Sequence, residues 1–90
     1  MKAPQRSFQM KSDYIIKPVL DLPATGANIK NLMKKNGMTV RSLQDIFEAP
    51  YPQAIYNWLS GKNMPSIDNL VILAEVFGVP VDEIVVVTKE

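Results

Sequence analysis

The sequence predicts an all-α fold: a compact domain of four to five short helices, with a short two-stranded β ribbon formed by its two ends. The first observation is composition, because 47% of the 90 residues are hydrophobic, which is typical of a folded domain. The second is that four segments in the middle combine helix-capping residues, apolar residues at helical spacing and glycine stops. The third is that the runs at 14–22 and 84–88 are rich in β-branched residues instead.

The two ends of the chain differ from its middle. Residues 1–13 show neither helical nor strand periodicity, so we expect a flexible tail there and a single domain over residues 14–90. In the run YIIKPVLDL at 14–22, Pro18 cannot donate a backbone hydrogen bond, which restricts the segment to an edge strand or an extended wrap. Its natural partner is the run IVVVT at 84–88. Because a lone ribbon is only marginally stable, we expect it to pack on helices or on a second subunit.

Two capped helices are expected in the first half of the domain. Thr25 can cap a helix that runs to about Asn36, where Gly37 supplies a left-handed stop. Thr39 then caps a short helix over 40–47. The positions expected to face the core are Ile29, Leu32 and Met33 in the first helix and Val40, Leu43, Ile46 and Phe47 in the second.

A third helix is expected after the bend EAPYP. Pro52 suits the first helical position, where a missing N–H is tolerated, so the helix should span 52–59 and stop at Gly61. Its inner face carries Ile55, Trp58 and Leu59, and its outer face carries Gln53, Tyr56 and Asn57.

A fourth helix and a last turn complete the expected core. Ser66 caps a strongly apolar helix that Gly78 closes, and Pro80 begins a turn with Asp82 and Glu83. The inward positions of the fourth helix are Leu70, Leu73, Ala74 and Phe77.

The absence of two residue types excludes most enzymatic chemistry. The chain has no Cys and no His, which removes disulfides, thiolate nucleophiles, the usual proton shuttle and the commonest metal ligands. Its serines have no His to activate them, and its four glycines form no phosphate-binding loop. We therefore expect no catalytic residue, no metal site, no cofactor and no enzymatic activity.

Membrane association is not expected either. No apolar run reaches the ~20 residues that a bilayer requires, and the N-terminus lacks the pattern of a signal peptide. We expect a cytoplasmic protein with no membrane partner, and nothing in the sequence indicates a small-molecule ligand.

Charge is distributed unevenly along a chain whose net charge is only +1. Residues 28–64 hold five Lys or Arg against two Asp or Glu, whereas residues 65–90 hold one Lys against five acidic residues. A basic middle can present a positive face to a polyanion, and the alternative is that these charges only solvate helix surfaces.

The second and third helices, over about 39–60, have the form of a helix-turn-helix unit. A DNA major groove about 12 Å wide admits one helix, and a Gln or Asn side chain can bond an adenine at both N6 and N7. Gln53 and Asn57 lie four residues apart on one face and could do this. Tyr56 beside them could contact a thymine methyl or a phosphate, or could be ordinary packing.

The span from Ile29 to Val85 resembles the Cro/C1-type (lambda-repressor-like) helix-turn-helix regulators, also called the xenobiotic-response-element family. The matching stretches are IKNLMKKNGMTVRSL, AIYNW, SGKNMPSIDNL and LAEVFGVPVDEIV. The more discriminating part of the match is the series Trp58, Gly61, Lys62, Pro65 and Leu70.

This resemblance implies a bacterial or phage transcription regulator that binds double-stranded DNA sequence-specifically, as a homodimer on two half-sites. By matching position, it implies base contacts from Gln53, Asn57 and Tyr56. The phosphate contacts that it implies are Thr39, Arg41, Lys62 and Asn63.

Three features depart from the family pattern. Between Leu43 and Ile55 the chain has one residue more than the usual spacing, and its turn contains two prolines in place of a glycine. Pro52 also stands where relatives often have a polar contact residue.

The alternative function is an antitoxin-like protein-interaction module that keeps the fold and binds a partner protein through its apolar ends.

Overall fold

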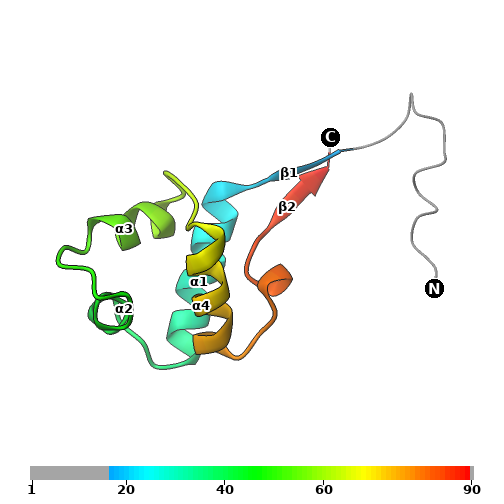
Figure 1. Cartoon of the computed structure of the whole chain (residues 1–90). Coiled ribbons are helices and arrows are strands. Elements are labelled where there is room, and N and C mark those ends of the chain that lie inside the picture. Colours follow the sequence, from blue (N-terminus) through cyan, green and yellow to red (C-terminus); the bar gives the residue numbers. More distant parts are fainter. Residues whose placement is uncertain (1–16, 90) are drawn as a thin grey trace.

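The computed structural model of the chain describes residues 17–89, which form four α-helices, a 3₁₀ turn and a two-stranded ribbon (Figure 1). In chain order the elements are β1 (Pro18–Leu20), α1 (Leu22–Lys35), α2 (Val40–Phe47), α3 (Gln53–Ser60), α4 (Ile67–Phe77), the 3₁₀ turn η3 (Val81–Glu83) and β2 (Val87–Lys89). The ribbon extends from one side of the helical body, and α2 and α3 lie on the opposite side (Figure 1). The expected helical fold with a terminal ribbon is confirmed. The expected tail at 1–13 lies outside the described residues.

One apolar cluster holds the helices together. Four of its members are almost completely shielded from solvent, namely Ile29, Leu43, Leu73 and Ile84, each 0% exposed. The rest of the cluster is Leu32, Met33, Ile55, Trp58, Leu70 and Phe77. Each α-helix contributes at least one side chain, so the helices are stabilised mainly by shared burial of apolar surface. None of the helices within residues 17–89 is long and apolar enough to span a membrane.

Helix α1 begins four residues earlier than the sequence indicates. Asp21, not Thr25, is the N-cap, and its carboxylate accepts a hydrogen bond of 3.0 Å from the backbone N–H of Ala24. Pro23 lies in the first turn of α1, where backbone N–H groups have no acceptor within the helix. The missing N–H of proline is therefore tolerated there. The prediction that Thr25 caps the helix is wrong, because this side chain is buried and accepts a hydrogen bond of 2.9 Å from Val86 N.

The C-terminal segment is fixed to α1 by polar contacts. Asn28 Nδ2 donates to the carbonyl oxygens of Glu83 and Ile84 at 2.8 and 2.9 Å. The backbone N–H of Asp21 donates to Val86 O at 2.8 Å. These contacts hold the chain between η3 and β2 against α1, which brings the two ends of the domain together.

The ribbon is antiparallel and shorter than expected. Val19 lies opposite Thr88, and Leu20 lies opposite Val87. The predicted strand at 84–88 reduces to β2, because Ile84 turns inward to the core instead of joining the strand. At the other end, Leu22 starts α1, and residues 14–16 of the expected strand lie outside the described residues.

Helix α2 has the predicted bounds and the predicted Thr39 cap. Leu43 faces the core as expected, and Val40 and Phe47 are half-buried against it. The expectation for Ile46 is wrong, since its side chain is 40% exposed. Val40, Leu43 and Phe47 lie on one narrow stripe of α2, and at 100° per residue Ile46 falls at the edge of that stripe.

Helices α3 and α4 also lie close to their predicted bounds. Pro52 is the N-cap of α3 and not its first helical residue, a difference of one position at a helix end. Gly61 adopts a left-handed conformation at the end of α3. Ser66 caps α4 through a 3.2 Å hydrogen bond from Asn69 N, and Gly78 ends that helix.

Candidate nucleic-acid interface

The orientation of α3 is set by its inner face. Ile55 and Trp58 are buried, and the Trp58 ring packs edge-to-face on Phe47 of α2, with ring centroids 5.4 Å apart and planes at 79°. Edge-to-face packing of two large rings favours one mutual angle over others. The pair therefore fixes how α3 sits on α2 and which residues of α3 face outward.

Two glycines allow α3 to approach the start of α1 closely. A Cβ atom on Gly26 would lie 2.4 Å from the carbonyl oxygens of both Trp58 and Leu59. A Cβ on Gly61 would lie 2.6 Å from Pro23 Cα, and Gly61 also has a φ of +81°. Since the obstructing atoms belong to backbone, no side-chain rotation could relieve these contacts. The C-terminal end of α3 is thus held against α1 at backbone distance.

The turn between α2 and α3 depends on an unusual backbone conformation. Glu48 ends α2 with φ 54° and ψ 40°, a left-handed conformation that side chains rarely adopt. Two hydrogen bonds link Gln44 and Ala49: Ala49 N donates to Gln44 O at 2.9 Å, and Gln44 Nε2 donates to Ala49 O at 3.3 Å. They fix the path of the longer, proline-containing bend.

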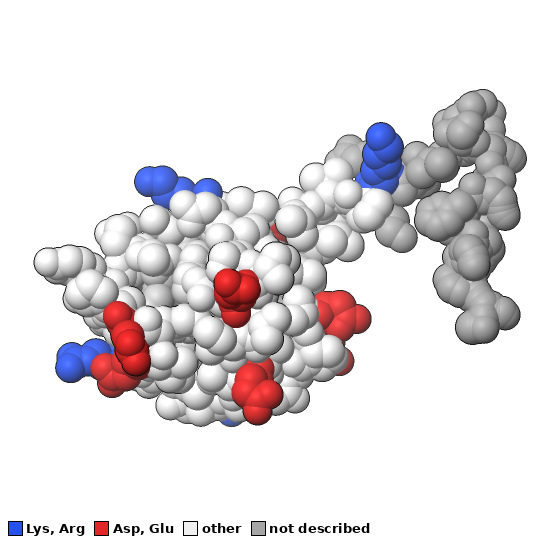
Figure 2. All heavy atoms as spheres, viewed as in Figure 1, with Lys and Arg blue, Asp and Glu red and all other residues white. Residues whose placement is uncertain are grey.

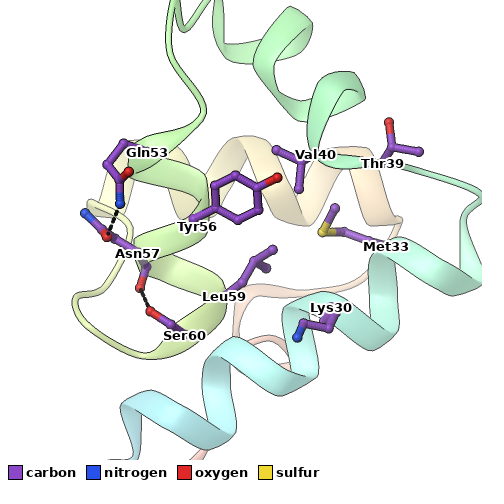
Figure 3. A pocket seen from close by; sticks show the side chains of 9 residues that line it. All are labelled: Lys30, Met33, Thr39, Val40, Gln53, Tyr56, Asn57, Leu59 and Ser60. Carbon is purple, nitrogen blue, oxygen red and sulfur yellow. Dashed lines mark hydrogen bonds between the residues drawn. The ribbon is translucent and has the colours of Figure 1, made fainter.

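The outer face of α3 carries two amides that are bonded to each other. Gln53 Nε2 donates to Asn57 Oδ1 at 3.0 Å (Figure 3). Gln53 is exposed and Asn57 is half-buried. The bond uses one of two N–H groups on Gln53 and leaves its Oε1 uncommitted to Asn57. Gln53 therefore keeps one donor and one acceptor, which is the pair that the N7 and N6 positions of adenine require.

An open groove of about 560 Å³ lies beside this face, between α1, the start of α2 and α3. It brings together four residues that the sequence singled out: Gln53, Tyr56, Asn57 and Thr39. Tyr56 is 51% exposed, and its ring projects across the groove towards Val40 (Figure 3). About half of the surface of this residue is therefore available for contact.

Thr39 and Arg41 lie at the N-terminal end of α2. Thr39 Oγ1 accepts from Ser42 N at 3.1 Å, and Ser42 Oγ accepts from Thr39 N at 3.1 Å, so the pair forms a capping box. Arg41 Nε lies 3.5 Å from Asp45 Oδ1, with side chains that are 80% and 73% exposed. An ion pair this exposed contributes little to stability, so a phosphate can replace Asp45 as the partner of Arg41.

Lys62 and Asn63 follow α3 in an exposed loop. Their backbone N–H groups donate to the Asn57 carbonyl at 2.9 and 3.3 Å, which folds the loop back onto the C-terminal end of α3. Neither residue lines the groove, and Arg41 does not line it either. The predicted phosphate contacts thus lie around the groove and not inside it.

The structure adds Lys30 of α1 to the candidate residues, because it lines the same groove as Gln53 and Asn57. The sequence indicated only that Lys30 contributes charge. Its place directly after buried Ile29 and one turn before buried Met33 puts it at the border of the apolar face of α1. From this position the sequence could have placed Lys30 beside the core. It could not have shown which other helix Lys30 faces.

The comparison with family models gives one match. The helix-turn-helix model matches residues 29–84, which is more than half of the chain and includes α2, α3 and α4. The chain belongs to the Cro/C1-type helix-turn-helix family. This is the family that the sequence motifs indicate, and membership in it makes the chain a DNA-binding protein of regulatory type and not an enzyme.

Solved structures are similar in fold to this Cro/C1-type domain. The DNA-binding domain of BldD from S. venezulae has a TM-score of 0.60 at 18% sequence identity, over 72% of this chain and 96% of that chain. A crystal structure of the DNA-binding domain of BldD has a TM-score of 0.60 at 19% identity, over 86% of this chain and all of that chain. No curated protein matches the chain significantly.

Acidic residues of this Cro/C1-type domain gather away from the basic middle of the chain. Asp68, Glu75, Asp82 and Glu83, on α4 and η3, are all exposed. In the view of Figure 2, Asp and Glu lie over the front of the helical body, and Lys and Arg appear mainly at its margins. A polyanion would be repelled by such a face, so it is expected to approach the domain from another side.

Proposed function

We propose that the chain is a sequence-specific regulator of transcription in a bacterium or phage, which inserts α3 into the major groove of double-stranded DNA. The observation that carries this proposal is the hydrogen-bonded pair Gln53 and Asn57 on the outward face of a helix fixed by Trp58. The bond to Asn57 restrains the Gln53 amide before DNA arrives, so less side-chain entropy is lost on binding. Gln53 and Asn57 would contact base edges, and Tyr56 would contact a thymine methyl or a phosphate.

The phosphate contacts in this proposal come from both ends of the helix-turn-helix unit. Thr39 and Arg41 would bind the backbone at the start of α2, where the helix presents free N–H groups. Lys62 and Asn63 would bind it after α3. Contacts of this kind set the register of the protein on the duplex, and they make affinity depend on salt.

We further propose that the chain acts as a homodimer in which the ribbon joins two copies. Val19, Leu20 and Val87 are 46%, 47% and 45% exposed, so the ribbon presents apolar surface on a two-stranded sheet that is marginal alone. Two copies would place two α3 helices on half-sites about 34 Å apart. The expected cytoplasmic location of the chain stays a prediction.

The experiment that tests the proposal is selection of bound duplexes from a random library, followed by affinity measurement over a salt series. We expect enrichment of one sequence with two related half-sites. Arg41 and Lys62 of two copies would neutralise about four phosphates, so affinity should fall by about two orders of magnitude between about 50 and 200 mM salt. Selection without enrichment, together with affinity that hardly changes with salt, would contradict the proposal.

The second candidate function is a protein-interaction module that keeps the fold and uses the exposed ribbon to bind a different protein. The same three apolar side chains favour it. Under this function the chain would fold normally and would bind mixed-sequence and selected duplexes with equally low affinity.

A further inference from the structure

The groove beside α3 has a lining unlike that of a phosphate-binding surface. Met33, Val40 and Leu59 line it with aliphatic side chains, and in the view of Figure 3 the Tyr56 ring lies among them. Carbon surfaces offer no donors to a phosphate oxygen, and the groove lining is mostly apolar. A sugar-phosphate backbone that passes over this region would leave the groove unfilled.

The polar groups of the groove are all electrically neutral or positive. Lys30 supplies an ammonium from α1, and Gln53 and Asn57 supply amides from α3; in the view of Figure 3, Leu59 and Tyr56 lie between them. No carboxylate is among the residues that line the groove within the described part of the chain. A ligand that suits this arrangement has an apolar body and one negative charge.

We propose that the groove binds a compact aromatic carboxylate. The aromatic body would stack against Tyr56 and cover the aliphatic floor, and the carboxylate would face the Lys30 ammonium. The volume of about 560 Å³ is in the range of small-molecule sites, which are mostly apolar with a few polar groups that fix orientation. Because the groove is open on one side, the affinity of a small probe is expected to be modest, with a dissociation constant on the order of 0.1–1 mM.

The proposed ligand would also control DNA binding, a step that rests on the proposed function. Gln53, Tyr56 and Asn57 belong both to the groove lining and to the residues proposed to contact bases. A bound aromatic ring would occupy the space beside these side chains, so ligand and duplex would exclude each other. Mutual exclusion of this kind lowers the affinity of each for the protein by the same factor.

The test is an NMR titration of the ¹⁵N-labelled full chain, without DNA, with three probes of the same shape: 2-naphthoate, 2-naphthamide and 2-naphthylmethylammonium. We expect shift changes for Lys30, Tyr56 and Asn57 and for their neighbours, with affinity in the order carboxylate, amide, ammonium. Equal affinity for the three probes would overturn the proposal, and so would shift changes centred on α4.

Matched variants separate the groove from the general surface. Tyr56→Ala should weaken 2-naphthoate by at least about fivefold, whereas Tyr51→Ala, at a tyrosine that is 75% exposed in the bend, should leave its affinity unchanged. Lys30→Gln should weaken 2-naphthoate about threefold and leave 2-naphthamide unchanged, because only the carboxylate gains from the charge. Lys35→Gln, on α1 but outside the groove, is the control for net charge. Equal effects within either pair would overturn the assignment.

Competition with DNA is measured separately. Saturating 2-naphthoate should raise the apparent dissociation constant for a selected duplex, and Tyr51→Ala should not change this effect. A duplex that binds equally well to the naphthoate-saturated protein would overturn the exclusion step. If the chain binds no DNA at all, the proposed function fails, but the probe titration still decides whether the groove is a ligand site.

Discussion

Trp58 is the side chain on which the position of α3 most depends. It is 7% exposed, and it packs on Phe47 within the core. Trp58→Ala should lower the free energy of unfolding by about 3–5 kcal/mol, because the cavity left by an indole is not filled by small movements. Urea unfolding followed by circular dichroism measures this loss. Tyr51→Ala is the control, and it should change stability by less than about 0.5 kcal/mol.

Glu48 stores backbone strain at the end of α2. Its φ of 54° suits glycine, so Glu48→Gly should raise the free energy of unfolding by about 0.5–1 kcal/mol. The matched control is Glu75→Gly in the last turn of α4, where a helical φ disfavours glycine and the change should lower it by about 0.5–1 kcal/mol. Thermal denaturation of both variants compares the signs, and two destabilised variants would show that the left-handed conformation of Glu48 is not a source of strain.

At the scale of single residues, some positions could not be predicted from the sequence. Asp21 and Thr25 are both good cap residues, and the sequence alone could not show that the later one is buried against Val86. Ile46 fits the helical period of α2, yet it lies at the edge of a narrow stripe. Lys30 could not be assigned to the site because its place in the groove depends on how α1 packs on α3. Each case depends on contacts between residues distant in sequence.

At the scale of elements, the contact between α1 and α3 is made at backbone distance. Gly26→Ala would place a Cβ atom 2.4 Å from two carbonyl oxygens of α3, so the helices would have to move apart. We expect a loss of more than about 2 kcal/mol in the free energy of unfolding, measured by urea denaturation. Gly78→Ala is the comparison, since nothing lies within 4 Å of its Cβ, and only its φ of +70° opposes the change, by about 1 kcal/mol. Similar losses in both variants would mean that the close approach is not required.

Elements with local signals were predicted well. The caps Thr39 and Ser66 and the stops Gly61 and Gly78 act within one turn of chain, and they gave α2, α3 and α4 to within one residue. The ribbon was predicted as a pairing of the two ends, but its length was not. Ile84 turns inward because its side chain packs in the core. Strand propensity, which is a local property, could not predict this.

At the scale of the whole molecule, the ribbon is the expected contact between two copies. Leu20→Lys places a charge on its exposed apolar surface, so the dimer should dissociate, and affinity for a duplex with two half-sites should fall at least tenfold. Sedimentation equilibrium measures the state of association. Val71→Lys, at an α4 position that is 56% exposed, makes the same change away from the ribbon and should leave the dimer intact. A Leu20→Lys chain that still dimerises would exclude the ribbon as the interface.

We expect the amide pair on α3, Gln53 and Asn57, to distinguish one DNA sequence from another. The most direct test measures the affinity of three variants for the selected duplex and for a duplex that differs from it by one base pair. The variants are Gln53→Ala, Lys62→Ala and, as a control at an exposed amide on α1, Asn31→Ala. Gln53→Ala should cost about 1–3 kcal/mol on the selected duplex and remove most of its preference over the variant, whereas Lys62→Ala should weaken both duplexes alike. Asn31→Ala should change neither. If Gln53→Ala instead weakens both duplexes by the same factor, Gln53 does not contact bases and the account is contradicted.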